Sequence, residues 1–154
     1  MAVYTTQKSQ TYGTVIGQGS SRDVITDVVS IACTTAMIDN TNDSIELLWL
    51  PKGAVVVGAM ISASDMDTNA SPTLAFDVGD AGDQDRLVAA SQVGRAGTLS
   101  ITLAPTGHGY KYTAATKIVA YVQTAAATAA AGTLTFTIMY FVDENFSATN
   151  AVVS

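Results

Sequence analysis

The sequence is poor in the residues that catalysis and covalent cross-linking require. Its 154 residues include one cysteine and one histidine. A single cysteine excludes an intrachain disulfide, and the run VVSIACTT around Cys33 predicts a small buried side chain rather than a reactive thiol. His108 lies between two glycines, and no Gly-x-Ser-x-Gly elbow presents a nucleophile, so we expect an exposed loop histidine. We predict no catalytic residue, no cofactor and no enzymatic activity.

Long hydrophobic runs are also missing. No stretch approaches the roughly 18 apolar residues of a membrane span, and the N-terminal residues MAVYTTQKSQTYG lack the basic and apolar regions of a signal peptide. We therefore expect a soluble protein that is made in the cytoplasm, without a membrane partner.

Positive charge is scarce. Thirteen acidic residues against seven basic ones give a net charge of −6, and the basic residues are scattered along the chain. A protein that binds nucleic acid needs clustered basic residues to neutralise phosphates, so we expect no nucleic-acid partner. Charged residues make up 13% of the chain and hydrophobic residues 48%, which predicts that a partner covers part of the surface.

Short β-rich runs separated by turn residues fill the chain, and no amphipathic helix is predicted. Seven to nine such runs indicate an all-β sandwich of two antiparallel sheets. We favour a jelly roll of two four-stranded sheets, with an immunoglobulin-like topology as the alternative. The first clear strand, over residues 24–35, is apolar on both faces in places, which predicts cover on both sides. Pro51-Lys52-Gly53 predicts a tight corner, and Trp49 just before it is expected in the core.

Two later segments show the period of two that is typical of half-buried strands. In residues 97–104, Leu99, Ile101 and Leu103 alternate with Ser and Thr. In residues 133–142, Leu134, Phe136 and Ile138 are predicted to face the core, with Thr133, Thr135 and Thr137 on the other side. The alanine-rich residues 125–131 are too few for an independent helix, and we predict a loop.

The chain divides into three predicted parts. Residues 1–22 are polar and form an extended N-terminal arm, which either orders on another subunit or frays. Residues 23–144 form the sandwich, and residues 145–154 form a polar C-terminal tail.

An acidic segment follows the central strands. Its carboxylates, Asp77, Asp80, Asp83 and Asp85, lie within nine residues and are interleaved with glycines. Such oxygen ligands suit a hard cation such as Ca²⁺, but the EF-hand spacing and its closing Glu are missing. The alternative is a solvated turn in which Asp77 or Asp85 pairs with Arg86, and we favour this reading, with no bound metal.

Near the end of the last strand, Met139, Tyr140 and Phe141 interrupt the alternation with threonine, so both faces become apolar. An uncovered apolar sheet face is an aggregation hazard. We therefore take these three residues as candidates for a subunit interface.

Four segments carry a family resemblance: LPKGAVVVGA, FDVGDAGDQDRLVAA, GYKYTAATKIVAYVQT and GTLTFTIMYFVDE. From about Asp43 to Glu144 the chain resembles small all-β virion proteins of tailed bacteriophages, of the head-decoration or capsid-cement type. The resemblance implies a jelly-roll subunit that forms a dimer or trimer, binds the major capsid protein on the capsid exterior and stabilises the head. Such a virion protein is synthesised in the host cytoplasm. The resemblance assigns no functional residue.

A second function belongs to another class. A jelly roll of the virion can instead be a binding module, for a tail component or a host glycan. Tyr110, Tyr112 and His108 supply the aromatic and polar groups that such a site needs.

Overall fold

The computed structural model describes residues 3–5 and 23–143. Most of the predicted N-terminal arm and the whole predicted C-terminal tail, residues 145–154, lie outside the described residues. The described chain is built from strands and two short 3-10 turns. The strands are β1 (Val3–Thr5), β2 (Ile25–Cys33), β3 (Ser44–Leu50), β4 (Ala54–Ala63), β5 (Ala75–Asp80), β6 (Asp83–Ser91), β7 (Leu99–Ser100), β8 (Thr116–Thr124) and β9 (Gly132–Val142), and the turns are η1 (Thr35–Met37) and η2 (Val93–Arg95).

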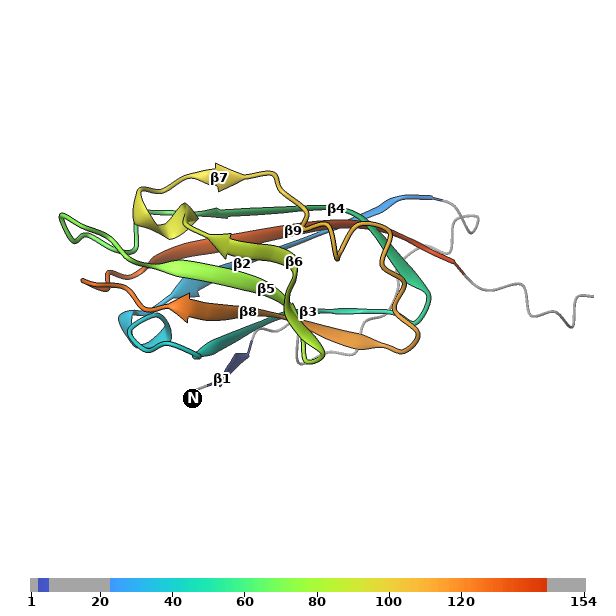
Figure 1. Cartoon of the computed structure of the whole chain (residues 1–154), viewed down its shortest axis with the longest axis horizontal. Helices are drawn as coiled ribbons and strands as arrows, with labels where there is room; N and C mark the ends of the chain where they lie inside the picture. The colour runs from blue at the N-terminus through green and yellow to red at the C-terminus, as the bar shows by residue number, and fades with distance from the viewer. Residues whose placement is uncertain (1–2, 6–22, 144–154) are drawn as a thin grey trace, which may run out of the picture.

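The strands form two packed sheets, as Figure 1 shows. One sheet has the order β1-β3-β8-β5-β6 and the other has the order β2-β9-β4-β7. From β2 onward the pairing is nested, since β2 pairs with β9, β3 with β8, β4 with β7 and β5 with β6, all antiparallel. This nesting of first strand with last is the wrapping of a jelly roll, which confirms the predicted fold class. Strand β1 adds a parallel edge beside β3.

The core lies between the inner faces of the two sheets. Alternate residues of β9 face it, and Leu134, Phe136 and Ile138 are fully buried, as the alternation with threonine predicts. From the opposite sheet, Phe76 and Ile118 pack into the same cluster. Close packing of this kind is the main source of stability in a small sandwich.

The corner between β3 and β4 has the predicted chemistry. Gly53 adopts a φ of 86°, in the left-handed region that glycine tolerates best. Its N–H donates to the carbonyl of Tyr112 at 2.7 Å, and an added Cβ would lie 2.8 Å from the carbonyl oxygen of Asp143. The corner therefore joins three distant parts of the chain and requires glycine.

A buried carboxylate joins two loops at one end of the sandwich. Asp67 Oδ2 accepts hydrogen bonds from the backbone N–H of Thr73 (2.7 Å), Leu74 (3.0 Å) and Ala127 (3.0 Å), and Oδ1 accepts one from Thr128 (2.9 Å). Burial alone would raise the pKa of Asp67, but these four donors outweigh burial and hold the pKa well below its usual range. The alanine-rich segment is thus a loop, as predicted, and Asp67 fixes its position.

Two sequence predictions about individual strands are wrong. The segment of residues 97–104 forms only the two-residue strand β7, and both Leu99 and Ile101 face solvent. Trp49 is half-buried on the outside of the five-stranded sheet, where the Nζ of Lys117 lies 5.2 Å from its ring centroid.

The segment of residues 86–92, for which the sequence did not separate helix from strand, belongs mostly to β6. No helix among the described residues is long and apolar enough to span a membrane.

Candidate functional site: the outer face of the four-stranded sheet

The outer face of the four-stranded sheet has no charged residue on its three long strands. Along these strands, buried residues that face the core alternate with residues that face outward. The alternation therefore identifies the side chains that form the outer face. The outward residues, named here the apolar face, are Thr26, Val28, Ser30 and Ala32 on β2, Thr133, Thr135, Thr137, Met139 and Phe141 on β9, and Val55, Val57, Met60 and Ser62 on β4.

Strand pairing places the apolar side chains of this face on three neighbouring strands, where they are interleaved with Ser and Thr. Thr137 lies between Val28 on β2 and Met60 on β4, and Phe141 lies beside Val55. Val28 is 48% exposed although it lies in the interior of β2, next to the buried Val29. A contiguous apolar surface that solvent reaches marks an interaction site more strongly than isolated apolar residues do. The predicted cover on both sides of β2 is not provided by residues 3–5 and 23–143, in which the outward residues of β2 are exposed.

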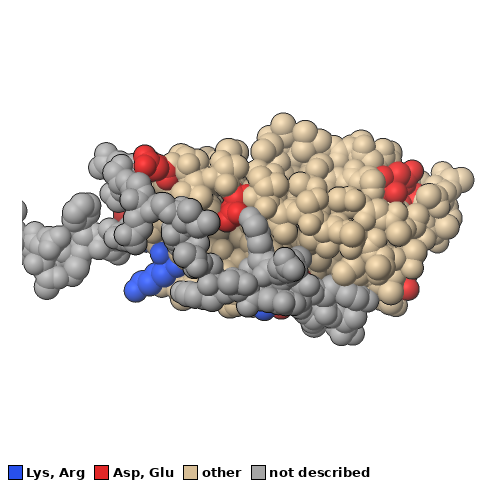
Figure 2. Space-filling view, turned by 180° about the vertical axis from the view of Figure 1, so that it is seen from behind, with Lys and Arg blue, Asp and Glu red and all other residues tan. Residues whose placement is uncertain are grey.

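The opposite sheet has a different character. On its outer face, Lys117 Nζ on β8 lies 2.6 Å from Glu46 Oε1 on β3 and also faces the ring of Trp49. Figure 2 views the molecule from the side of the four-stranded sheet and shows a broad uncharged surface, with acidic side chains in a few separate spots. The outer face of the five-stranded sheet thus carries charged side chains, which the outward residues of β2, β9 and β4 lack.

The three predicted interface residues divide between the two sides of β9. Met139 lies between Thr26 and Gly58 on the apolar face, and Phe141 lies on the same face. Tyr140 points the other way and is buried in the core, where burial first and nearby Asp27 second raise its pKa. Tyr140 is therefore placed as a core residue, and the structure leaves Met139 and Phe141 as interface candidates. Three further residues of this face, Val28, Val57 and Met60, were not predicted from the sequence, although the two-sided apolar pattern of their strands was a signal for them.

The four carboxylates of the acidic segment do not converge. Asp80 accepts hydrogen bonds from the N–H groups of Gly82 and Asp83, and its Oδ2 lies 2.6 Å from Arg86 Nε. Asp77 instead accepts the N–H of Ala90 at 2.6 Å, on the other side of a bulge in β6 where Ala90 has a φ of 47°. The expected pairing of Arg86 with Asp77 or Asp85 is wrong, because Arg86 binds Asp80 and lies 3.6 Å from Asp83.

The remaining acidic pair is Asp83 with Asp85. A side-chain hydrogen bond in which protonated Asp83 donates to Asp85 is the main reason that the pKa of Asp83 is raised, with burial and the nearby charge of Arg86 contributing in opposite directions. Among the described residues, no group of three or more His, Cys, Asp or Glu side chains is placed to hold a metal ion. The segment is a β-hairpin turn that hydrogen bonds and ion pairs organise.

We predict that calcium does not affect stability. The melting temperature should be the same with excess Ca²⁺ and with chelator, because Asp80 is engaged by Arg86 and by backbone N–H groups. Asp80→Ala should lower the melting temperature equally in both conditions. Thermal unfolding followed by circular dichroism measures this, and a chelator-sensitive melting temperature that Asp80→Ala makes insensitive would establish a calcium site instead.

The aromatic residues considered for ligand binding are occupied by one another. Tyr112 is buried, and its ring meets that of Tyr110 edge-on, with centroids 4.9 Å apart and planes at 74°. The guanidinium of Arg86 lies over the ring of Tyr110, with its Cζ 3.8 Å from the ring centroid. Burial, and then the nearby charge of Asp80, raises the pKa of Tyr112. His108 alone of the three predicted residues is exposed, so the loop presents no aromatic platform.

Cys33 is buried in β2, as the sequence predicted. Burial raises the pKa of its thiol to about 11, against a smaller opposite effect of a hydrogen bond that the sulfur accepts from the backbone of Leu134. The thiol therefore stays protonated at neutral pH, which disfavours nucleophilic chemistry.

Comparison with known proteins gives structural matches. A scan against protein-family models and a search of curated proteins each find no match. A chain of the cyanophage Pam1 capsid asymmetric unit is 34% identical, with a TM-score of 0.72, over 90% of this chain and 98% of that one. A chain of the capsid of Ralstonia phage GP4 is 26% identical, with a TM-score of 0.75, over 94% and 100%. A chain of the acid-stable capsid of Helicobacter pylori bacteriophage KHP30 is 16% identical, with a TM-score of 0.55, over 78% and 92%, and shows likeness of fold alone.

The fold and these matches define the class. The chain is a jelly-roll protein of the small virion proteins of bacteriophages. Within that class it belongs to the same family as the matched chain of the cyanophage Pam1 capsid.

Proposed function

We propose that the protein is a non-enzymatic capsid decoration, or cement, protein that binds the outer surface of the shell formed by the major capsid protein. The observation that carries the proposal is the match to nearly the whole length of a chain from the cyanophage Pam1 capsid and to all of one from the Ralstonia phage GP4 capsid. Both are chains of about this size within a capsid. We infer that the protein acts as a structural component of the head, as a homo-oligomer.

The charge of the chain supports a position on the capsid exterior. Its net charge is −6, whereas the capsid interior holds DNA, whose phosphates repel acidic proteins. Among the described basic residues, Arg86, Lys111 and Lys117 are each paired with a carboxylate of the same chain. Little positive charge is therefore left to bind phosphate.

The apolar face provides the docking surface for the major capsid protein. A stable interface buries about 800 Å² on each partner and depletes charge at its centre. Three adjacent strands without an outward charge meet the second condition, and Val28, Met60, Met139 and Phe141 supply apolar contacts. The binding-module alternative has less support, because Tyr110 and Tyr112 pack against Arg86 and each other.

The test is co-sedimentation with capsids that lack the protein. Wild-type protein should sediment with them, and Thr137→Asp should reduce binding at least about tenfold, because it places a charge at the centre of the apolar face. The control is Gln123→Asp, which adds the same charge at an exposed position of β8 on the opposite sheet. Equal binding by the two variants would remove the apolar face from the interface.

The N-terminal segment is tested in the same assay. Deleting residues 1–22 should leave the sandwich folded, because β2–β9 complete the jelly roll without β1. If the segment is an arm that reaches a neighbouring subunit, the deletion weakens attachment to capsids. A full-length protein that never sediments with the capsids would overturn the cement function and favour the binding module.

A further inference from the structure

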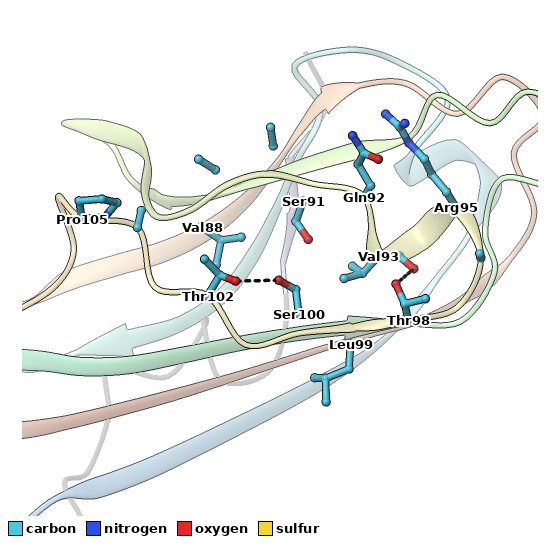
Figure 3. A pocket seen from close by; sticks show the side chains of 14 residues that line it. Val88, Ser91, Gln92, Val93, Arg95, Thr98, Leu99, Ser100, Thr102 and Pro105 are labelled. Atoms are coloured by element: carbon cyan, nitrogen blue, oxygen red, sulfur yellow. Dashed lines mark hydrogen bonds between the residues drawn. The ribbon is translucent and has the colours of Figure 1, made fainter.

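A cavity of about 620 Å³ lies on the side of the sandwich where β6 and β7 are the last strands of their sheets (Figure 3). Its lining comes from the second half of β6, from η2 and from the residues around β7. Two backbone hydrogen bonds close its ends, since the N–H of Thr98 donates to the carbonyl of Val93 at 3.0 Å and that of Ala104 to Leu87 at 2.9 Å. Leu103 also packs against the core. The fold itself therefore holds the walls of the cavity in place.

The floor of this cavity is apolar apart from one hydroxyl. Val88, Val93 and Ala104 are buried there. Ser91 projects toward the cavity, is 7% exposed, and its hydroxyl has no hydrogen-bond partner among the described residues. Buried polar side chains nearly always have a partner, so this exception needs a physical explanation. A water molecule satisfies the hydroxyl alone, whereas an occupant that is mostly apolar also covers the apolar floor.

The charge of the lining disfavours an ionic occupant. Of the described residues that line the cavity, Arg95 alone is charged. Its Nε donates to the carbonyl of Leu74 at 2.8 Å and its Nη2 to that of Thr73 at 2.9 Å, and Figure 3 shows its guanidinium apart from the Ser91 hydroxyl. A charged group beside Ser91 would therefore be buried without a counter-charge, which is costly.

We propose that this cavity is an anchor pocket for a tyrosine side chain of the major capsid protein, a choice of partner that rests on the proposed function. A tyrosine ring supplies apolar surface to the floor, and its hydroxyl can both donate and accept a hydrogen bond, as the hydroxyl of Ser91 can. An aliphatic side chain would leave Ser91 unpaired, and a small polar one would leave the apolar floor uncovered. Tyrosine is also one of the residues that contribute most binding energy at the buried centres of interfaces.

The cavity is placed for the same partner as the apolar face. Leu99 pairs with Ser62, an outward residue of β4, and is 59% exposed. Its side chain points away from the cavity, whereas the side chains of Ser100 and Thr102 project toward it (Figure 3). β7 thus lies between the apolar face and the cavity. One partner that covers the face is therefore close enough to insert a side chain beside it.

Binding of p-cresol, which is the side chain of tyrosine, tests the chemistry of the cavity without a capsid. Titrated into the full chain and followed by NMR, p-cresol should shift the amide signals of the lining residues, with a dissociation constant on the order of 1 mM. Toluene, which lacks the hydroxyl, should bind at least about threefold more weakly. Ser91→Ala should remove this preference, and Ser71→Ala, at an exposed serine in the loop before β5, should keep it. Binding of p-cresol elsewhere, equal binding of toluene, or a preference that Ser91→Ala leaves intact would each overturn the proposal.

A blocking variant tests the partner. Thr102 is exposed and projects toward the cavity, so Thr102→Trp should fill the opening and abolish p-cresol binding while keeping the wild-type melting temperature. In the co-sedimentation assay it should weaken attachment to capsids at least about tenfold. Gln123→Trp, which adds the same side chain at an exposed position of β8, should attach like the wild type.

The two experiments separate the possible failures. If Thr102→Trp blocks p-cresol but attaches to capsids like the wild type, the assignment of the pocket to a capsid tyrosine is overturned. If wild-type protein binds p-cresol in the cavity but never binds capsids, the cement function and the capsid partner are overturned, and the pocket for a phenol ring stands.

Discussion

Ile138→Asp is expected to prevent folding. Ile138 is fully buried in β9, at the centre of the four-stranded sheet, and it pairs with Ala59 on β4. Aspartate at this position would place a carboxylate without a counter-charge among apolar side chains, which costs several kcal/mol whether it stays ionised or takes up a proton. Since the stability of a domain of this size is about 5–15 kcal/mol, little or no folded protein should remain. Yield of soluble protein and the melting temperature measure the effect.

The neighbouring position supplies the control. Thr137 faces outward, so Thr137→Asp should keep the fold and change the free energy of unfolding by about 1 kcal/mol or less. The same variant should lose capsid binding, which separates stability from assembly within two adjacent residues. Equal melting temperatures for Ile138→Asp and Thr137→Asp would contradict the assignment of Ile138 to the core side of β9 and of Thr137 to its outer side.

Asp67→Ala is expected to cause the second-largest loss of stability. The side chain is 1% exposed and accepts four backbone N–H groups from two loops. Removing the carboxylate leaves these N–H donors without an acceptor, and each buried donor without an acceptor lowers the free energy of unfolding by about 1–3 kcal/mol. The loss should therefore reach at least about 4 kcal/mol, measured by urea unfolding at pH 7.

The same residue should make stability depend on pH. The pKa of Asp67 is lower in the folded protein than in the unfolded chain, because the four donors outweigh the effect of burial. Its contribution is thus fully present above the unfolded pKa of about 3.9 and is lost as the pH falls below that value toward the folded pKa. Wild-type protein should lose stability between pH 5 and pH 2, and Asp67→Ala should lose less over the same range.

Asp65→Ala is the matched control for both measurements. Asp65 lies in the same loop and is exposed, and its Oδ1 accepts a hydrogen bond from the N–H of Asp67 at 3.2 Å. It should cost less than about 1 kcal/mol and leave the pH dependence unchanged. Similar losses for the two alanine variants would mean that loop conformation, rather than the buried carboxylate, sets the stability of this end.

Much of the fold could be predicted from local patterns. The alternation of Leu134, Phe136 and Ile138 with threonine predicts both a strand and its buried side, because only one face of that strand meets the core. The corner at Gly53 was predictable because few other residues adopt its backbone conformation. The nested order of the strands was one of two alternatives, since pairing between distant segments leaves no local pattern.

The errors have a common physical origin. The period of two in residues 97–104 indicates that one side of the segment is apolar, but it does not say whether the rest of the fold covers that side. Leu99 and Ile101 are exposed. Trp49 is a large aromatic residue of the kind often found in cores, yet its ring lies beside Lys117. The two residues are brought together by the register of β3 with β8.

The candidate site was predictable in part. Met139 and Phe141 were found because they interrupt a regular row of threonines, whereas Val28 and Met60 required the strand order to be recognised as their neighbours. The role of Asp67 was not predictable, since its four donors come from segments six to sixty-one residues away. The spacing of the acidic segment contained no information about the bulge at Ala90 that engages Asp77.

The nested pairing of the strands sets an order for folding during synthesis. The β5–β6 hairpin closes through contacts between neighbours in the chain, but β2 must wait for β9, which is made more than a hundred residues later. Pairing over such separations is slow, and domains emerge from the ribosome from the N-terminus onward. The apolar face needs β2, β9 and β4 side by side, so it is not assembled until translation of the domain is nearly finished. Incomplete nascent chains on one polysome therefore do not associate through this face. The completed subunit is the first species that presents the face for association.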